Sequence, residues 1–98
     1  MSFAEYVAED IRLSILSLLA KDQGYSHNDR VLQRALEMLG HKVSADQVRT
    51  HLAWLADQGL VAVETVETFS IATLNQRGLD VAEGRALVPG VRRPQPGR

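Results

Sequence analysis

The sequence predicts a small, mainly α-helical domain with one β-hairpin, because three signals follow one another along its 98 residues. Three stretches place apolar residues at helical spacing, and each is followed by a glycine or a turn. The period then changes to that of strands, and a short fourth helix precedes an end rich in proline and glycine. We expect one domain over residues 1–87 and a flexible basic tail over residues 88–98.

The first two expected helices are amphipathic. Ser2 and Glu5 have the spacing of a capping box and open a helix from about Phe3 to Lys21. Its buried stripe would contain the residues Val7, Ile11, Ile15, Leu18 and Leu19. The second helix would begin near Ser26 or Asn28, both good N-caps, and run to Leu39, with Gly40 as its stop.

The third expected helix, residues 45–58, carries the strongest local pattern. Ser44 and Gln47 form a capping box, Val48, Leu52 and Leu55 make one apolar stripe, and Gly59 ends the helix. The opposite face carries short or polar residues, namely Asp46, Gln47, Arg49, Thr50 and Ala53. A short turn joins this helix to the second one, so the two can cross steeply as in a helix-turn-helix.

A two-stranded hairpin and a short closing helix follow. Leu60–Val63 and Phe69–Ala72 are rich in strand-forming residues, and the tip of the hairpin falls somewhere within residues 64–68. Asn75 would cap a fourth helix from Gln76 to about Arg85 that buries Leu79 and Ala82, with Val81 at the margin. We expect an extended conformation after that, because prolines and glycines exclude regular structure there.

The order and spacing of these elements resemble a winged helix-turn-helix domain, in which the hairpin is the wing. Over its whole length the chain is similar to small winged-helix proteins of Mu-like phages and prophages, themselves similar to ArsR-type regulators. The stretches that carry this resemblance are GYSHNDRVLQRALEMLGHKVSADQV, AWLADQGLV, ATLNQRGLDVAEGR and VPGVRRP. The resemblance implies the fold and a role in transcription or in phage assembly within the bacterial cytoplasm. Typical ArsR metal sensors carry cysteine or histidine–carboxylate sites, and this chain offers no such cluster.

The leading functional hypothesis is therefore duplex DNA binding by a phage transcription regulator. Arg49 could hold guanine and Gln47 adenine through paired hydrogen bonds, while Ala53 and the Thr50 methyl group could contact thymine. Arg92 and Arg93 of the tail could contact phosphate. The alternative is that these residues are simply the solvated face of an amphipathic helix and a docking tail whose Val88, Val91 and Pro94 enter a groove on a partner.

Charge argues against this hypothesis. Residues 1–83 hold seven basic and twelve acidic residues, whereas residues 84–98 hold four arginines and no acid. The hairpin carries Glu64 and Glu67 and no basic residue from Leu60 to Leu74, which would repel phosphate. A non-catalytic adaptor that binds a phage-encoded protein in packaging or assembly fits these acids better.

Other classes of function find little support. We expect no enzyme, because Ser14, Ser17 and Ser70 lie on expected helices and strands without a nearby base, and no catalytic motif occurs. We expect no metal and no cofactor, because three scattered histidines without cysteine have no ligand spacing. No apolar run is long enough to span a membrane. The first helix is apolar over a broad arc, so we expect a homodimer through the residues Phe3, Tyr6, Val7 and Leu13.

Overall fold

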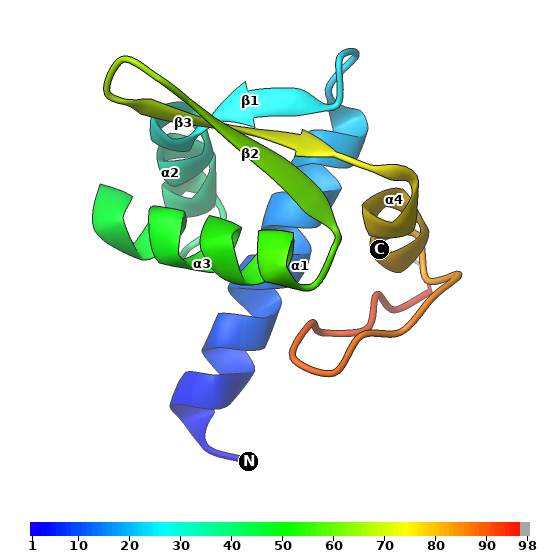
Figure 1. Cartoon of the computed structure of the whole chain (residues 1–98). Helices are drawn as coiled ribbons and strands as arrows, with labels where there is room; N and C mark the ends of the chain where they lie inside the picture. The colour runs from blue at the N-terminus through cyan, green and yellow to red at the C-terminus, as the bar shows by residue number, and fades with distance from the viewer. Residues whose placement is uncertain (97–98) are drawn as a thin grey trace.

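The computed structural model describes residues 1–96 and shows a small α/β fold of four helices and a three-stranded antiparallel sheet (Figure 1). The elements in chain order are α1 (Phe3–Lys21), β1 (Ser26–Asn28), α2 (Asp29–Met38), α3 (Ala45–Asp57), β2 (Val61–Val66), β3 (Phe69–Leu74) and α4 (Gln76–Ala82). The sheet lies on one side of the helices, and the N-terminal end of α1 projects from the opposite side (Figure 1).

Each helix begins at a side chain that accepts a hydrogen bond from a backbone N–H three residues later. The four capping residues are Ser2, Asn28, Ser44 and Asn75. At α3 the capping box is complete, because the Gln47 side chain also accepts from the Ser44 N–H at 2.8 Å. These bonds satisfy donors that the helix itself leaves without partners, so the sequence defines the starts of the helices well.

The sheet has one strand more than the sequence predicts. Its order is β1-β3-β2, and β1 pairs with β3 through Ser26 opposite Thr73 and Asn28 opposite Ile71. The sequence therefore predicts β2 and β3 but misses β1. A strand of three residues is too short to show an alternating pattern, and its pairing partner lies more than 40 residues away in the sequence.

One apolar core joins all the helices to the sheet. Its members are Ile11, Ile15, Leu16, Leu19, Leu32, Leu36, Val48, Leu52, Leu55, Leu60, Val61, Ala72, Leu74, Val81, Val88 and Val91. The closing helix ends at Ala82, earlier than predicted, and buries Val81 more deeply than Leu79 or Ala82. It approaches the chain at Leu60 so closely that a Cβ on Gly78 would lie 2.1 Å from the Leu60 carbonyl oxygen.

The prediction of a separate tail from residue 88 is wrong for the described part of that segment. Val88 and Val91 are buried, and the Arg92 backbone N–H donates to the Glu9 carbonyl oxygen of α1 at 3.2 Å. We name residues 88–96 the C-terminal segment. Burial of the apolar side chains of Val88 and Val91 in the core stabilises this segment against the fold. The prolines and glycines prevent regular secondary structure there, but they do not prevent this packing. Residues 97 and 98, also assigned to the predicted tail, lie outside the described residues.

Candidate interaction surfaces

The outer face of α3 is exposed, but most of its polar groups bond within the helix. Gln47, Thr50 and Ala53 are exposed. The Gln47 side-chain oxygen is occupied by the Ser44 N–H, and the Thr50 hydroxyl donates to the Asp46 carbonyl oxygen at 3.0 Å. A base edge would therefore have to compete with bonds that already exist.

Arg49 is held by two carboxylates of its own chain. Its Nη1 donates to Asp29 Oδ2 at 2.9 Å, and its Nη2 donates to Asp46 Oδ1. Asp29 is fully buried, and its other oxygen accepts from the Ser70 backbone N–H at 3.3 Å. These hydrogen bonds, led by the one with Asp29, raise the pKa of Arg49. Arg49, expected from the sequence to hold guanine, is thus bonded within the protein, where it pairs with a buried carboxylate that links α2, α3 and β3.

Arg12 fastens the C-terminal segment to α3. Its guanidinium carbon lies 4.1 Å from the centre of the Trp54 ring, and its Nη1 donates to the Gly90 carbonyl oxygen at 2.9 Å. Gly90 has a φ of +99°, and a Cβ there would lie 2.5 Å from the Trp54 ring. Trp54 packs at the edge of the core, and only glycine allows the segment to cross it.

His51 completes the contacts of Arg12. The Arg12 Nε donates to His51 Nδ1 at 3.4 Å, which requires an unprotonated nitrogen at that position. Burial, reinforced by the positive charge of Arg12, lowers the pKa of His51. The imidazole is therefore neutral near pH 7, and it packs against α1.

A second contact fastens the C-terminal segment to α1. The Asp10 carboxylate accepts from Arg92 Nη1 at 2.6 Å and bonds to His41 Nε2 at 2.7 Å. Burial alone would raise the pKa of Asp10, but the hydrogen bonds from Arg92 and His41 and their charges lower it. Arg92, predicted to contact phosphate, is instead bonded within the molecule, whereas Arg93 is exposed.

Several exposed cations form no ion pair within residues 1–96; Lys21, Arg77 and Arg93 are among them, and three more lie on α2 and in the turn before α3. Among residues 1–96, the exposed Arg30, Arg34 and Lys42 take part in no ion pair, and Arg30 lies over the Phe69 ring at 5.5 Å. Arg30 and Arg34 lie on α2, which packs against α3, and Lys42 lies in the turn that leads into α3. No local pattern in the sequence distinguishes these three cations from the other basic residues of residues 1–83.

The predicted dimer residues divide into two pairs. Phe3 is 81% and Tyr6 45% exposed, whereas Val7 and Leu13 pack partly against the core. An open groove of about 360 Å³ lies between the N-terminal half of α1 and the start of α3, and Phe3, Val7 and Val43 are among its lining residues. The apolar stripe of α1 thus continues beyond the part of the helix that the core covers.

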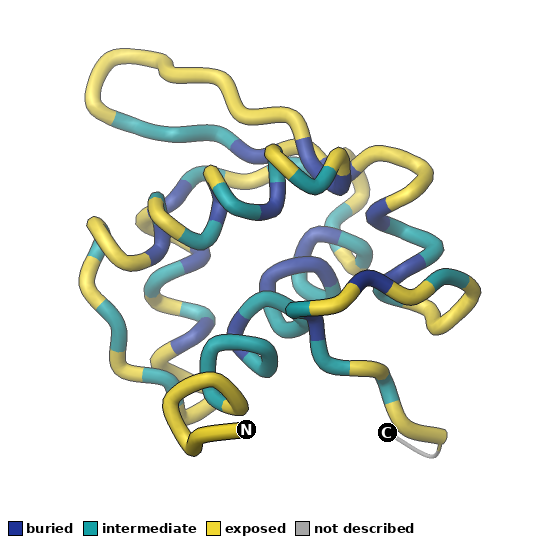
Figure 2. The backbone as a smooth tube through the Cα atoms, turned by 60° about the horizontal axis from the view of Figure 1, so that its bottom comes forward, coloured by how far each residue is buried: buried dark blue, intermediate teal, exposed yellow. Residues whose placement is uncertain are grey.

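The hairpin differs from all these regions, because its acids have no basic partner. Glu64 and Glu67 are exposed, and in the described part of the chain neither forms an ion pair. Figure 2 shows one strand of the hairpin exposed along most of its length, and this strand is β2, in which only Val61 is buried. β2 is also an edge of the sheet.

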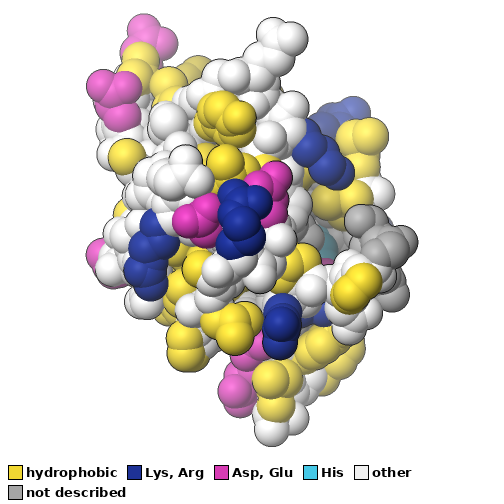
Figure 3. Space-filling model, turned by 90° about the vertical axis from the view of Figure 1, so that its right-hand side faces the viewer, with side chains coloured by type: hydrophobic (Ala, Val, Ile, Leu, Met, Phe, Trp, Pro, Cys, Tyr) yellow, Lys and Arg dark blue, Asp and Glu magenta, His cyan; other side chains and the backbone are white. Residues whose placement is uncertain are grey.

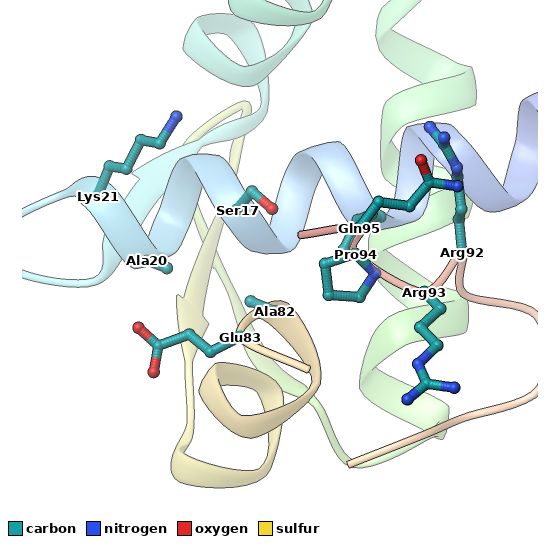
Figure 4. Close-up of a pocket in the computed structure, with 10 residues that line it drawn as sticks. Ser17, Ala20, Lys21, Ala82, Glu83, Arg92, Arg93, Pro94 and Gln95 are labelled. Carbon is teal, nitrogen blue, oxygen red and sulfur yellow. The ribbon is translucent and has the colours of Figure 1, made fainter. Parts of the chain in front are cut away.

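A groove between α1, α4 and the C-terminal segment shows no arrangement of side chains suited to catalysis or ligand binding. It measures about 460 Å³ and is floored by small or apolar residues of α1 and α4, with the C-terminal segment as one wall. Figure 4 shows that the charged ends of Lys21, Glu83 and Arg93 point in different directions. On the α4 face, basic and acidic side chains lie side by side (Figure 3), and the structure pairs Arg85 with both Asp80 and Glu83.

Residues 1–96 contain neither a cluster of three metal-ligating side chains nor a helix able to span a membrane. No three histidine, aspartate or glutamate side chains gather there as a metal ion would need. None of the described helices combines the length and the apolar character that crossing a bilayer requires.

The residues that sequence reasoning missed are those that bond over long separations. In the sequence, no local pattern distinguishes Asp29 or Asp10 from the other acids of the expected helices. Their partners lie between 20 and 82 residues away, so no local pattern could identify them.

Comparisons with known proteins give two relatives. The chain is 49% identical over 92 residues to the uncharacterized protein gp26 of Escherichia phage Mu, which covers 94% of this chain and 95% of that protein. It is 40% identical over 80 residues to an uncharacterized protein of Haemophilus influenzae, covering 81% of this chain and 78% of the other. No family model and no solved structure matches the chain.

Proposed function

Because the chain belongs to the family of gp26 of phage Mu, we propose that it is a non-catalytic phage protein that binds another phage-encoded protein, as an adaptor in packaging or assembly. The observation that carries this proposal is the distribution of charge. The arginines best placed for nucleic acid, Arg49 and Arg92, neutralise carboxylates of the chain itself. The exposed hairpin offers Glu64 and Glu67 instead.

The energetics of polyanion binding support the same choice. Phosphate neutralisation by lysine and arginine supplies most of the sequence-independent affinity for DNA. An arginine that leaves Asp29 to contact phosphate would leave a fully buried carboxylate without a counter-charge. The affinity gained would be offset by destabilisation of the fold.

We also propose that the architecture is a winged helix-turn-helix. The order of a helix, a short strand, two helices and a hairpin supports this, together with a sheet in which β3 is central. In this description α3 is the recognition helix and β2–β3 the wing. The architecture hosts different functions, so it does not select DNA over protein.

DNA binding by an ArsR-like homodimer is the second candidate, and one observation favours it. Exposed Gln47, Thr50 and Ala53 lie on α3, and the exposed cations Arg30, Arg34 and Lys42 lie on α2 and in the turn that leads into α3. The dimer would form through Phe3 and Tyr6 at the projecting end of α1. In this candidate α2 supplies the phosphate contacts that α3 lacks.

Titration of a fluorescent random duplex at low and at moderate salt separates the two candidates. We expect no change in polarisation at either salt concentration. A signal that falls steeply as salt rises, and that is lost in Arg30→Ala combined with Arg34→Ala, would replace the adaptor with the DNA-binding candidate. Glu37→Ala is the matched control, because it removes a charge of the opposite sign from the same helix.

The adaptor itself is tested by capture from cells in which a related phage replicates. Tagged protein is cross-linked and its phage-encoded partners are identified by mass spectrometry. We expect one phage-encoded protein to be enriched with the natural chain and depleted with Glu64→Lys combined with Glu67→Lys. If the phage-encoded protein were enriched equally with the natural chain and with the variant, the hairpin would not be the binding site.

A further inference from the structure

We propose that the open edge of β2 binds an extended, basic peptide segment of the partner protein as a fourth strand of the sheet. This inference rests on the proposed function and names the site and the class of partner. Three features carry it: backbone groups that point outward, exposed β-branched side chains, and acids without a counter-charge.

The outward backbone groups follow from the register of the sheet. In an antiparallel pair, alternate residues of a strand direct their N–H and C=O groups to opposite sides. The Ser70 N–H donates to Asp29 and the Leu74 N–H to the Tyr25 carbonyl oxygen, so the even-numbered residues of β3 face β1 and α2. The odd-numbered residues, 69, 71 and 73, therefore face β2.

Residues 69, 71 and 73 of β3 lie opposite 66, 64 and 62 of β2. These three residues of β2 thus bond inward, and Val61, Val63 and Thr65 direct their N–H and C=O groups to the open edge. Val61 is buried, so Val63 and Thr65 present the accessible groups. A peptide strand that pairs with these two residues can form four backbone hydrogen bonds.

The side chains favour a particular partner. The Val63 side chain, 39% exposed, lies on one face of the sheet with Thr65, and a β-branched residue opposite it would pack across the new strand pair. Glu64 lies on the opposite face of the strand. Glu64 and Glu67 attract lysine or arginine, and no basic residue of the hairpin competes. Neither proline nor lysine protects this edge, although natural edge strands often carry such residues against unwanted pairing. The fitting partner is a segment in which β-branched and basic residues alternate.

The probe is a short fluorescent peptide of alternating valine and lysine, with two matched controls. One control replaces lysine by glutamate, and the other is N-methylated along the backbone so that it cannot pair. We expect the lysine peptide to bind at least about tenfold more tightly than either control, with a dissociation constant below about 1 mM. Binding of the acidic peptide with equal affinity, or of none of the three, would overturn the β2 site.

Hydrogen exchange localises the binding. The amides of Val63 and Thr65 point outward in the free protein, so they should exchange fast and become protected when the peptide binds. The amides of Ala62 and Glu64 bond inward and are the internal control. Protection of Val63 and Thr65 in the free protein that rises with its concentration would instead identify a second copy as the occupant of the edge, and the peptide proposal would be wrong.

The protein variant that tests the edge is Val63→Pro. Proline there removes an outward N–H without a bond to β3, so thermal unfolding should show a folded protein while peptide binding is lost. Ala62→Pro is the comparison variant, because it removes a backbone hydrogen bond between β2 and β3. Its thermal unfolding shows how a protein with a disrupted hairpin behaves. If Val63→Pro still captures the same phage-encoded protein from cells, the β2 site fails while the adaptor function stands. If no phage-encoded protein is captured even by the natural chain, both fail.

Discussion

The C-terminal segment and the β2–β3 hairpin are both charged regions at the periphery of the fold, but only one is neutralised by the rest of the molecule. Arg92 of the segment bonds to Asp10, and Arg12 of α1 bonds to the Gly90 carbonyl oxygen. In the hairpin, Glu64 and Glu67 are exposed and β2 leaves one edge open. Charges that are already paired stabilise the fold, and only the unpaired ones are available to a partner.

The largest effect is expected where the segment crosses Trp54. Gly90→Val places a side chain on the Trp54 ring and forces a branched residue to a φ of +99°. Val88 and Val91 would leave the core together, so we expect a loss of about 3 kcal/mol in the free energy of unfolding. Urea unfolding measures it. Leu87→Ala, at an exposed neighbouring position, should change stability by less than about 0.5 kcal/mol. If Gly90→Val were as stable as the natural chain, the C-terminal segment would be a free tail and not a packed part of the fold.

The second effect concerns the buried carboxylate beside α3. Asp29→Ala removes the acceptor of the Ser70 N–H and the main partner of Arg49. We expect a loss of about 2 kcal/mol in the free energy of unfolding, measured by chemical denaturation. Arg49→Ala should also destabilise the protein, because Asp29 would stay buried without its counter-charge.

A double-mutant cycle shows whether Arg49 acts through Asp29. Asp29→Asn in the Arg49→Ala background should recover part of the lost stability, since a neutral amide needs no counter-charge. Strictly additive effects of the two substitutions would mean that the pair is not coupled. Arg49 would then be available to a ligand, and the contrast with the hairpin would weaken.

The sequence predicts the parts of this contrast that depend on local patterns. The start of α3 follows from Ser44 and Gln47, and the acids of the hairpin are plain from the sequence. The pairing of Arg49 with Asp29 and the burial of Val91 are set by tertiary packing between residues far apart in the chain. Local patterns therefore led to the assignment of Arg49 and Arg92 to a ligand. They could not reveal β1 or the open edge of β2.

The third effect is a dependence of stability on pH. The folded protein lowers the pKa of Asp10, so the unfolded chain binds the proton more readily. Asp10 therefore stabilises the fold fully above its ordinary pKa of about 3.9, and this stabilisation is lost as pH falls through the lowered value. Asp10→Asn should cost about 1 kcal/mol near neutral pH, and the difference from the natural chain should shrink below about pH 4.

Thermal unfolding of the two proteins between about pH 7 and pH 2.5 tests this dependence. His51 also has a lowered pKa, and its contribution declines in both proteins as pH falls below the ordinary histidine value, so it cancels in the difference. A difference between the two proteins that stays constant down to the lowest pH would show that Asp10 does not hold Arg92 and His41 as a carboxylate.

The smallest effect is expected at the tip of the hairpin. Glu67 has a φ of +55°, a conformation that glycine adopts without strain, and it is the first of the two residues between Val66 and Phe69. Glu67→Gly should therefore raise the free energy of unfolding by about 0.5 to 1 kcal/mol. Thr68→Gly is the matched control, because Thr68 has no positive φ and glycine there only adds freedom to the unfolded chain. If the same Glu67→Gly protein binds the basic peptide more weakly although it is more stable, the glutamate is at this position for its charge. Unchanged binding would leave Glu64 as the acid that selects the partner.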